Sequence, residues 1–231
     1  MKVQKLDHIA LYMGDRDAAA GFLTTHLGFH VVDHTERYTL VGAGGRLGKL
    51  TLFDAPQGTT PSPGEIERIT IRVADPEAAA ARLPGEAGAV PKDGGYSFTG
   101  PEGLPLALVA GEGEFADYDL GGFVLRSGSP EESASTFVEM GFAPGDEATT
   151  VRAGDYLIRL TDSTPEENGG GMLFHVGCLV DSAGDHRKQA EERGLEVQDF
   201  VDGPNTLAVF VRGPEGVSVE YVEHKPTFSL T

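Results

Sequence analysis

The chain has 231 residues, and 39% of them are hydrophobic, which is enough to bury a substantial core and too apolar for a disordered chain. Its 36 acidic and 18 basic residues give a formal net charge of −18, which excludes nucleic acid and membrane surfaces as expected partners. No apolar stretch approaches 18 residues and the first residues are too polar for a secretory leader, which predicts a cytoplasmic protein without a membrane span.

The first part of the chain predicts a βαβββ unit. Residues 3–13 alternate as a strand does, and an alanine-rich helix follows that begins near Asp15 or Asp17 and ends at Gly28. Three short strands are then expected at 30–34, 37–42 and 48–54. These elements define unit 1, residues 3–54.

The same order of elements recurs three times. Unit 2 has a strand at 67–75, a helix at 76–83 and strands near 88–91, 95–99 and 104–110. Unit 3 begins with a strand at 118–127 and a helix within 130–142, and its last strand is 155–162. Unit 4 has a strand at 172–181, a helix at 182–194 and three strands ending at 224. Linkers rich in Gly, Pro, Ser or Thr separate the units at 55–65, 110–117 and 163–171.

An internal duplication divides these units into two halves. The segment at 98–111 resembles 210–224, and the LGF at 27–29 resembles the MGF at 140–142. Both matches are about 113 residues apart, which predicts an N-terminal half, 1–112, with units 3–54 and 67–110. The C-terminal half, 113–231, then holds units 118–162 and 172–224. The GPEG that both halves contain lacks a Walker lysine and is expected to be a tight turn.

Each βαβββ unit has one curved sheet face that it cannot bury alone, so paired units are expected to form an open, barrel-like cup. The segments LDHIALYMGDRDAAAGFLTTHLGFHVV (6–32) and GPEGVSVEYVEH (213–224) carry a resemblance to the vicinal-oxygen-chelate superfamily. That superfamily includes glyoxalase I, fosfomycin and bleomycin resistance proteins, and extradiol ring-cleaving dioxygenases. The resemblance covers nearly the whole chain and implies an α+β fold of four βαβββ units in two cups.

The resemblance also implies a metal site, because His8, His175 and Glu220 occupy the strand positions of the family's ligands. Two imidazoles and one carboxylate leave three positions open on an octahedral ion, as in non-haem Fe(II) oxygenases. We therefore expect a divalent metal, Fe(II) first, with Mn(II), Zn(II) or Ni(II) as alternatives. A histidine in an apolar strand is more often a core residue, but here three positions match together.

The other units cannot supply this set of ligands. Their corresponding positions are expected at Ile69 and Ala107 in unit 2 and near Gly122 in unit 3. A metal shared by His8, His175 and Glu220 therefore requires unit 1 to pair with unit 4. Units 2 and 3 then form a second cup without a metal.

One position departs from the extradiol pattern. The resemblance implies a Tyr on the third strand of the last unit, but this chain has Phe210, which cannot donate a proton. The polar candidates for the cup wall are His30, His34 and Tyr38, and Arg212 is expected to share the face of Phe210. His30 and His34 are separated by an even number of residues and should point to one side of their strand.

The remaining groups support no catalytic role. His26, His186 and His224 are expected to be exposed, and Cys178 is expected to be a buried, inert thiol. The resemblance thus implies a metal-dependent enzyme on a small vicinally oxygenated molecule, first an extradiol-type dioxygenase. A glyoxalase-like lyase or isomerase and a drug- or metabolite-binding protein without chemistry remain the alternatives. Either a monomer or a homodimer is compatible with the sequence.

Overall fold

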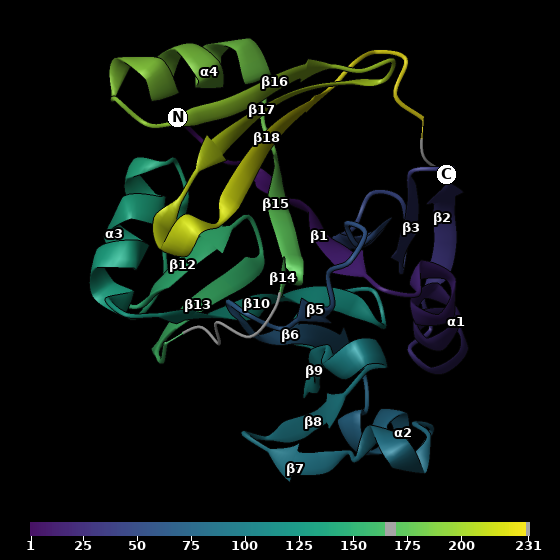
Figure 1. The fold of residues 1–231 in the computed structure, drawn as a ribbon. Helices are drawn as coiled ribbons and strands as arrows, with labels where there is room; N and C mark the ends of the chain where they lie inside the picture. Colours follow the sequence, from purple (N-terminus) through teal and green to yellow (C-terminus); the bar gives the residue numbers. More distant parts are fainter. Residues whose placement is uncertain (165–169, 230–231) are drawn as a thin grey trace.

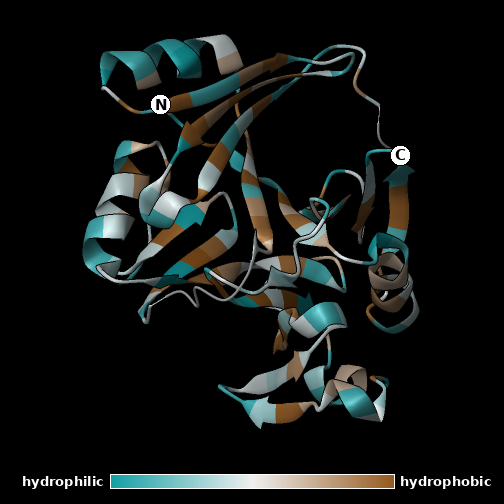
Figure 2. Ribbon diagram, viewed as in Figure 1, coloured by the Kyte–Doolittle hydropathy of each residue, from teal (hydrophilic) through white to brown (hydrophobic). Residues whose placement is uncertain are grey.

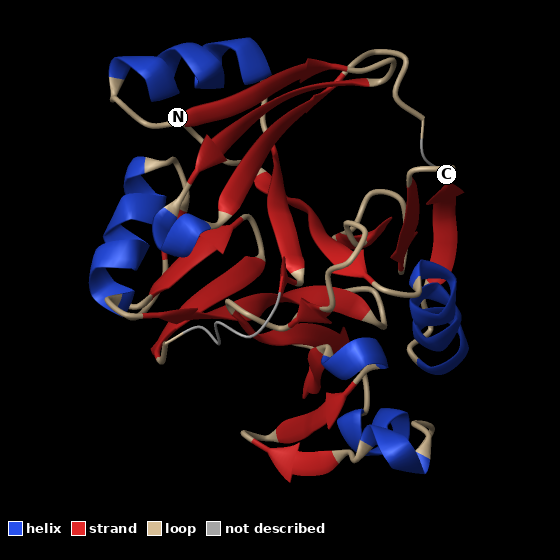
Figure 3. Cartoon of the chain, in the orientation of Figure 1, coloured by secondary structure: helices blue, strands red, loops and turns tan. Residues whose placement is uncertain are grey.

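The computed structural model describes residues 1–164 and 170–229, which form two large mixed sheets with helices on their outer sides. Figures 1 and 3 show the two sheets packed side by side, with α4 and α3 over one flank and α1 over the other. In the described part of the chain the α-helices are α1 (Arg16–His26), α2 (Pro76–Ala80), α3 (Pro130–Glu139) and α4 (Ala183–Glu192). No helix among these residues is long and apolar enough to cross a membrane.

The first sheet combines the first and last units of the chain. Its eight strands run in the order β16-β17-β18-β15-β1-β4-β3-β2. Their bounds are β1 (Lys5–Met13), β2 (His30–His34), β3 (Tyr38–Gly42), β4 (Lys49–Asp54), β15 (Leu173–Leu179), β16 (Val197–Asp202), β17 (Thr206–Arg212) and β18 (Ser218–His224). The predicted pairing of unit 1 with unit 4 is confirmed, because β1 and β15 are antiparallel neighbours at the sheet centre.

The second sheet combines the two middle units in the same way. Its order is β11-β12-β13-β10-β6-β9-β8-β7, with β10 and β6 antiparallel at the centre. The bounds are β6 (Ile66–Val73), β7 (Val90–Lys92), β8 (Gly95–Thr99), β9 (Pro105–Ala110), β10 (Asp119–Ser127), β11 (Ala143–Pro144), β12 (Thr150–Ala153) and β13 (Tyr156–Asp162). The predicted α+β fold of paired βαβββ units is therefore confirmed. The division into two halves at residues 112 and 113 stays a prediction.

The linkers carry more structure than their composition suggests. The linker at 55–65 contains β5 (Pro61–Ser62), which pairs with β14 (Gly170–Gly171). The amide of Met172 also donates to the Ser62 carbonyl at 2.7 Å. The part of the last linker at 165–169 lies outside the described residues. Backbone pairing therefore holds these two linkers beside each other, although they are far apart in the sequence. Their Gly and Pro content alone is typical of loops without such pairing.

The two sheets share an apolar interior whose residues come mainly from the central strands. Figure 2 shows hydrophobic residues concentrated along these strands, whereas α4 is largely hydrophilic. Leu6, Ile9 and Leu11 of β1 and Ile69 and Ile71 of β6 have at most 1% of their surface exposed. Burial of such side chains is the main favourable contribution to this fold.

The repeated GPEG turns connect the two sheets. They form the short 3-10 turns η2 (Pro101–Gly103) and η3 (Pro214–Gly216), in which Glu102 and Glu215 both have φ of 54°. The Glu102 carboxylate accepts hydrogen bonds of 2.7 Å from the amides of Gly14 and Asp15, at the start of α1. A third short turn, η1 (Gly85–Ala87), follows α2.

Glu215, in the turn of the first sheet, forms the corresponding contact with the second sheet. One of its carboxylate oxygens accepts from the hydroxyls of Ser127 and Ser133, at 2.6 Å and 2.8 Å. Each turn of one sheet thus binds the helix start of a unit in the other sheet. The sequence predicted the turns. Their contacts with the helix starts of the other sheet, which together we call the clasp, depend on how the sheets pack.

We expect Glu102→Ala to lower the free energy of unfolding by about 1–2 kcal/mol, as the loss of a helix N-cap does. Two amide donors lose a charged acceptor, although both remain accessible to water. Urea unfolding followed by circular dichroism measures the change. Glu86→Ala is the matched control, because Glu86 is exposed and makes no side-chain hydrogen bond or ion pair with another described residue. Equal stability of the two variants would contradict the clasp.

Candidate metal centre

Three side chains of the first sheet converge on one point. His8 lies in β1, His175 in β15 and Glu220 in β18, and the antiparallel register pairs His8 with Gly177 and Ala10 with His175. Gly177 has a steric reason to be glycine, because a Cβ there would lie 2.3 Å from Cε1 of His8. The imidazole of His8 therefore lies over Gly177 of β15 and points toward His175. A larger residue than glycine at 177 would occupy this space.

The three ligand atoms have the spacing of one face of an octahedron. His8 Nε2 is 2.9 Å from His175 Nε2 and 3.0 Å from Glu220 Oε2, and His175 Nε2 is 3.2 Å from Glu220 Oε2. Cis ligands at about 2.1 Å from an octahedral ion lie about 3.0 Å apart, against about 3.4 Å around a tetrahedral ion. Among the described residues this is also the one group of three or more His, Cys, Asp or Glu that could hold an ion. The geometry therefore fits a divalent metal with three positions left open.

The polar atoms of the site also indicate a missing partner. Glu220 Oε2 and His175 Nδ1 are buried, and neither has a hydrogen-bond partner within the described residues. The contacts of Glu220 Oε2 with the two imidazoles are short, but they lack hydrogen-bond geometry. An unsatisfied buried carboxylate oxygen is costly, and coordination to a cation removes that cost. The residues present therefore fit a bound metal ion.

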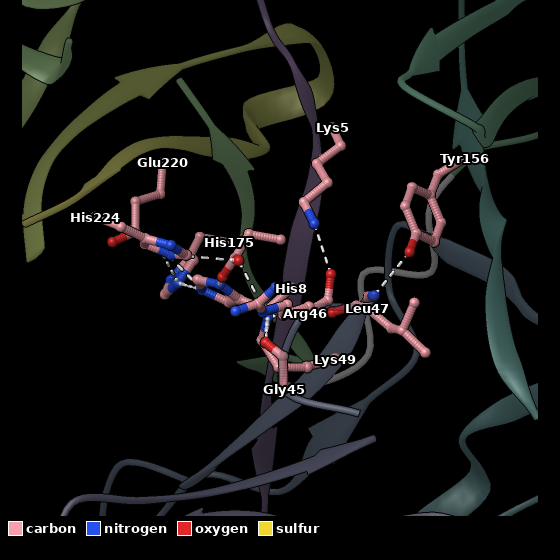
Figure 4. Close-up of polar contacts among 12 residues, drawn as sticks. Lys5, His8, Gly45, Arg46, Leu47, Lys49, Tyr156, His175, Glu220 and His224 are labelled. Atoms are coloured by element: carbon pink, nitrogen blue, oxygen red, sulfur yellow. Dashed lines mark hydrogen bonds and ion pairs between the residues drawn. The ribbon is translucent and has the colours of Figure 1, made fainter. Parts of the chain in front are cut away.

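A β-bulge brings Asp7 to the same side of the strand as His8. Leu6 pairs with Cys178 and His8 with Gly177, so Asp7 is the extra residue of β1. Its carboxylate lies 2.9 Å from His8 Nδ1 and accepts from the Nζ of Lys49 at 3.0 Å. Figure 4 shows Lys49 and His224 beside the His8, His175 and Glu220 group. Asp7 thus fixes the ring orientation of His8 and leaves Nε2 directed toward the other two ligands.

Strong coupling between these groups changes their protonation. Burial lowers the pKa of His8, but its hydrogen bond to Asp7 and the adjacent Glu220 carboxylate outweigh burial and raise the pKa to about 9. Burial raises the pKa of Glu220, whereas the two imidazoles lower it more strongly, to about 2. Burial lowers the pKa of His175 below its usual range. Glu220 is thus a carboxylate and His175 a neutral imidazole at neutral pH, which are the forms that bind a metal, whereas His8 carries a proton that a metal ion would displace.

The ligand group opens into a cavity of about 750 Å³ with an aromatic wall. Phe174, Phe210 and Phe53 surround the ring of His175, with centroid distances of 4.6, 5.2 and 6.2 Å. The C-terminal segment contributes Phe228, whose ring stacks on His224. A cavity of this size and composition accommodates a small organic molecule.

The structure brings together only part of the predicted catalytic set. Tyr38 and Phe210 line the cavity, and the Tyr38 hydroxyl donates to Asp33 at 2.8 Å. Burial and the Asp33 carboxylate raise the pKa of Tyr38 to about 12, so its hydroxyl keeps its proton. Arg212 is not among the described residues that line the cavity, and it pairs with Glu196 at 2.9 Å.

The expectation that His30 and His34 point together is wrong. The pairing of β2 with β3 shifts between Val31 and Asp33, so the strand contains an extra residue there. That bulge reverses the alternation and directs Asp33 into the cavity. Both histidines are exposed, and neither belongs to the described cavity lining.

Two further expectations about histidines are corrected. His224 was expected to be exposed without a role, but it lines the cavity and lies 3.5 Å from Asp7. His186 is buried, where it accepts from the Lys2 amide and contacts the Ser182 carbonyl. Sequence reasoning also missed Asp7 and Lys49, because strict alternation directs a neighbour of His8 away from it. The charged pair Asp-His within an apolar strand was the available signal.

The second sheet has no equivalent ligands. Its register places Gly122, Arg68 and Ala107 at the positions of His8, His175 and Glu220. Arg68, not the expected Ile69, therefore corresponds to His175. Gly122 has a φ of 136°, and a Cβ there would lie 1.8 Å from the Leu157 carbonyl oxygen. No side chain can stand at this position, so the predicted absence of a second ligand set has a backbone cause.

Comparison with known proteins identifies the fold. Residues 5–106 match the model of the Glyoxalase/Bleomycin resistance protein/Dioxygenase superfamily. Glyoxalase I from Zea mays is similar in structure, with a TM-score of 0.74 and 15% identity over 95% of this chain and 92% of that one. A "putative dioxygenase" from Bacillus subtilis subsp. subtilis str. 168 has a TM-score of 0.76 and 19% identity over 97% of this chain and 86% of that one.

A third similar structure is the cppA protein from Streptococcus pneumoniae TIGR4, with a TM-score of 0.62 and 15% identity over 96% of this chain and 100% of that one. A search of curated protein sequences gave no match. The similarity to solved structures covers nearly the whole chain, and at these identities it concerns the fold alone. Residues 5–106 therefore resemble the Glyoxalase/Bleomycin resistance protein/Dioxygenase superfamily in sequence, and the chain as a whole has the fold of these solved structures.

Proposed function

We propose that this protein is a divalent-metal-dependent enzyme that acts on a small molecule with two vicinal oxygen atoms, and specifically an extradiol-type ring-cleaving dioxygenase. The observation that carries the proposal is the cis spacing of 2.9–3.2 Å among His8, His175 and Glu220. Three protein ligands on one face leave room for two substrate oxygens and one further small molecule.

A bound divalent ion would supply Lewis-acid polarisation of the two oxygens and, as Fe(II), the electrons that O₂ activation requires. The chain's own residues hold this site in place. Asp7 holds His8 through Nδ1, and Lys49 neutralises Asp7 from the other side. The two imidazoles and Glu220 thereby keep a fixed orientation before the substrate enters.

The aromatic wall supports an aromatic substrate. Phe53, Phe174 and Phe210 offer faces and edges to a ring and exclude water from the reacting atoms. The Tyr38 hydroxyl is the one phenolic proton donor in the described cavity lining, and Asp33 orients it. Phe210 gives no proton, so we assign proton donation to Tyr38 from the opposite wall.

The lyase or isomerase alternative needs a free base beside the metal. Thr51 occupies the position in unit 1 that corresponds to Glu220, because Ala10 pairs with Thr51 as Gly177 pairs with Glu220. The carboxylates of Asp7 and Asp33 are already engaged by Lys49 and Tyr38. This arrangement favours a three-ligand oxygenase over an enzyme that relies on a second metal-side carboxylate.

The metal-binding prediction uses three variants. We expect His175→Ala and Glu220→Ala to lose stoichiometric metal, because each removes one of three ligands. Elemental analysis of protein purified without oxygen measures the metal and also identifies it. His26→Ala is the control, since His26 is a partly exposed residue of α1 that contacts Phe22 and does not line the cavity. Full metal occupancy in Glu220→Ala would contradict the assignment of the carboxylate ligand.

Asp7→Asn tests the support of His8. We expect the affinity for the metal to fall about 10- to 100-fold, as it does when the hydrogen-bond partner of a metal-binding histidine is lost. Competition with a chelating dye measures the affinity, and circular dichroism verifies folding. Asp199→Asn removes the same charge from the cavity rim without contact to the ligands. An equal loss in both variants would indicate a general charge effect.

The ring-cleavage prediction concerns oxygen uptake. Protein loaded with Fe(II) should consume O₂ in the presence of a catechol or hydroquinone and form a coloured ring-opened product. Tyr38→Phe should lower turnover about 10²-fold or more, the usual contribution of a general acid. Phe210→Tyr should raise turnover, whereas Phe200→Tyr, which lies against Arg187, should not. An oxygen electrode and absorbance follow both quantities.

Absence of O₂ uptake across a panel of diols, with Fe(II) bound and the three ligands intact, would contradict the dioxygenase proposal. In that case metal-dependent isomerisation without O₂ would support the lyase or isomerase alternative. Substrate binding without turnover would support a binding protein. The metal analysis separates these outcomes from simple failure of metal loading.

A further inference from the structure

The second sheet encloses a basic cavity that the metal site does not use. Its volume is about 1010 Å³, and seven Lys or Arg side chains line it. The whole chain has 18 such residues and a net charge of −18, so positive charge is concentrated on this face. Five acidic residues belong to the same lining, which leaves an excess of two positive charges.

The strand pattern directs the arginines into one space. Arg68, Thr70 and Arg72 alternate along β6 and all three line the cavity, as residues on one face of a strand do. Arg152 and Arg159 approach from β12 and β13. The arginines therefore surround a common volume instead of projecting separately into solvent.

Small residues make this volume available. Gly121 lies beside Arg72, and a Cβ there would be 3.0 Å from the Arg72 Cγ. Ala107 stands where the first sheet has Glu220. The register also places Arg159 at the position of Thr51. The positions that hold the candidate ligands in the first sheet therefore hold small residues or arginines in the second sheet.

Several donors in the cavity lack a strong partner. The Nε atoms of Arg68 and Arg72 are buried and have no hydrogen-bond partner within the described residues. Arg68 pairs with Asp93 and Arg159 with Glu147, whose side chains are 67% and 57% exposed. Ion pairs with such exposed partners contribute little and can be exchanged for a ligand.

Arg72 differs from these residues because it is fixed in place. It pairs with the buried Asp119, and its guanidinium lies 5.5 Å from the centroid of the Tyr156 ring. A rigid, partly buried cation in the lining of a cavity provides a preorganised contact for an anionic group. Arg68 and Arg159 can then close around the remainder of a bound ligand.

We propose that this cavity binds a small organic anion with two or more charged oxygen groups, through the guanidinium groups of Arg68, Arg72 and Arg159. Guanidinium forks bind phosphate and carboxylate oxygens in bidentate pairs, which explains arginine in place of lysine on these strands. The volume accommodates a metabolite-sized molecule rather than a single inorganic ion. This site is separate from the metal centre and does not depend on the function proposed for it.

Isothermal titration of the metal-loaded protein tests the proposal. The probes are 3-phosphoglycerate, which carries a phosphate and a carboxylate, succinate, which carries two carboxylates, and uncharged glycerol. We expect one 3-phosphoglycerate to bind per chain, with affinity that falls as salt increases, and glycerol not to bind. The relative affinity of succinate distinguishes a phosphate site from a carboxylate site.

Variants locate the bound anion. Arg68→Gln and Arg159→Gln should each weaken binding about tenfold, the effect of one charged hydrogen bond. Arg187→Gln is the matched control, because Arg187 lies on α4 and lines neither cavity. His175→Ala should leave the affinity unchanged, since it alters only the metal centre.

Three results would overturn the proposal: no binding of either anion, unchanged affinity in both arginine variants, or loss of binding in His175→Ala. The last result would place the anion at the metal instead. If Arg68→Gln fails to fold by circular dichroism, Arg159→Gln decides the question, because the side chain of Arg159 is 38% exposed and not needed for the core.

Discussion

The antiparallel pairing of β1 with β15 is the interaction on which the rest of the structure depends. It joins the first and last units of the chain into one sheet and places His8 beside His175. The bulge within this pairing brings Asp7 and His8 to the same side, and Gly177 leaves the space that the His8 ring occupies. A one-residue shift of β1 against β15 would move His8 to the face of the sheet opposite His175 and Glu220.

The two cups show how one backbone arrangement supports different chemistry. Both central strand pairs contain a bulge, at Asp7 in β1 and at Gly121 in β10. In the first cup the bulge orients a ligand and its supporting carboxylate. In the second it creates a position that only glycine tolerates, and arginines fill the surrounding space. The difference arises from side chains, because the strand order of the two sheets is the same.

The loop between β3 and β4 lies against both cavities. Arg46 and Leu47 line the basic cavity, while the Gly45 and Leu47 carbonyls accept from the Nζ of Lys49. The hydroxyl of Tyr156 in the second sheet accepts from the Gly48 amide at 2.8 Å. Lys49 in turn holds Asp7 and, through it, His8. The support of the candidate metal site therefore includes contacts from the second sheet.

The sequence by itself determined the four repeated units and the α+β class, because hydrophobic alternation and turn residues are local signals. The three candidate ligands came from the resemblance of these units to the vicinal-oxygen-chelate superfamily. The sequence also determined that unit 1 must lie beside unit 4, since no other unit contains a second histidine at the required strand position. Only the tertiary structure decided the surroundings of that site. Bulges in β1 and β2 reverse the alternation, so Asp7 and Asp33 enter the cavity while His30 and His34 do not share a face. The basic cavity was equally hidden, because its arginines come from separate strands and the overall charge of the chain is strongly negative.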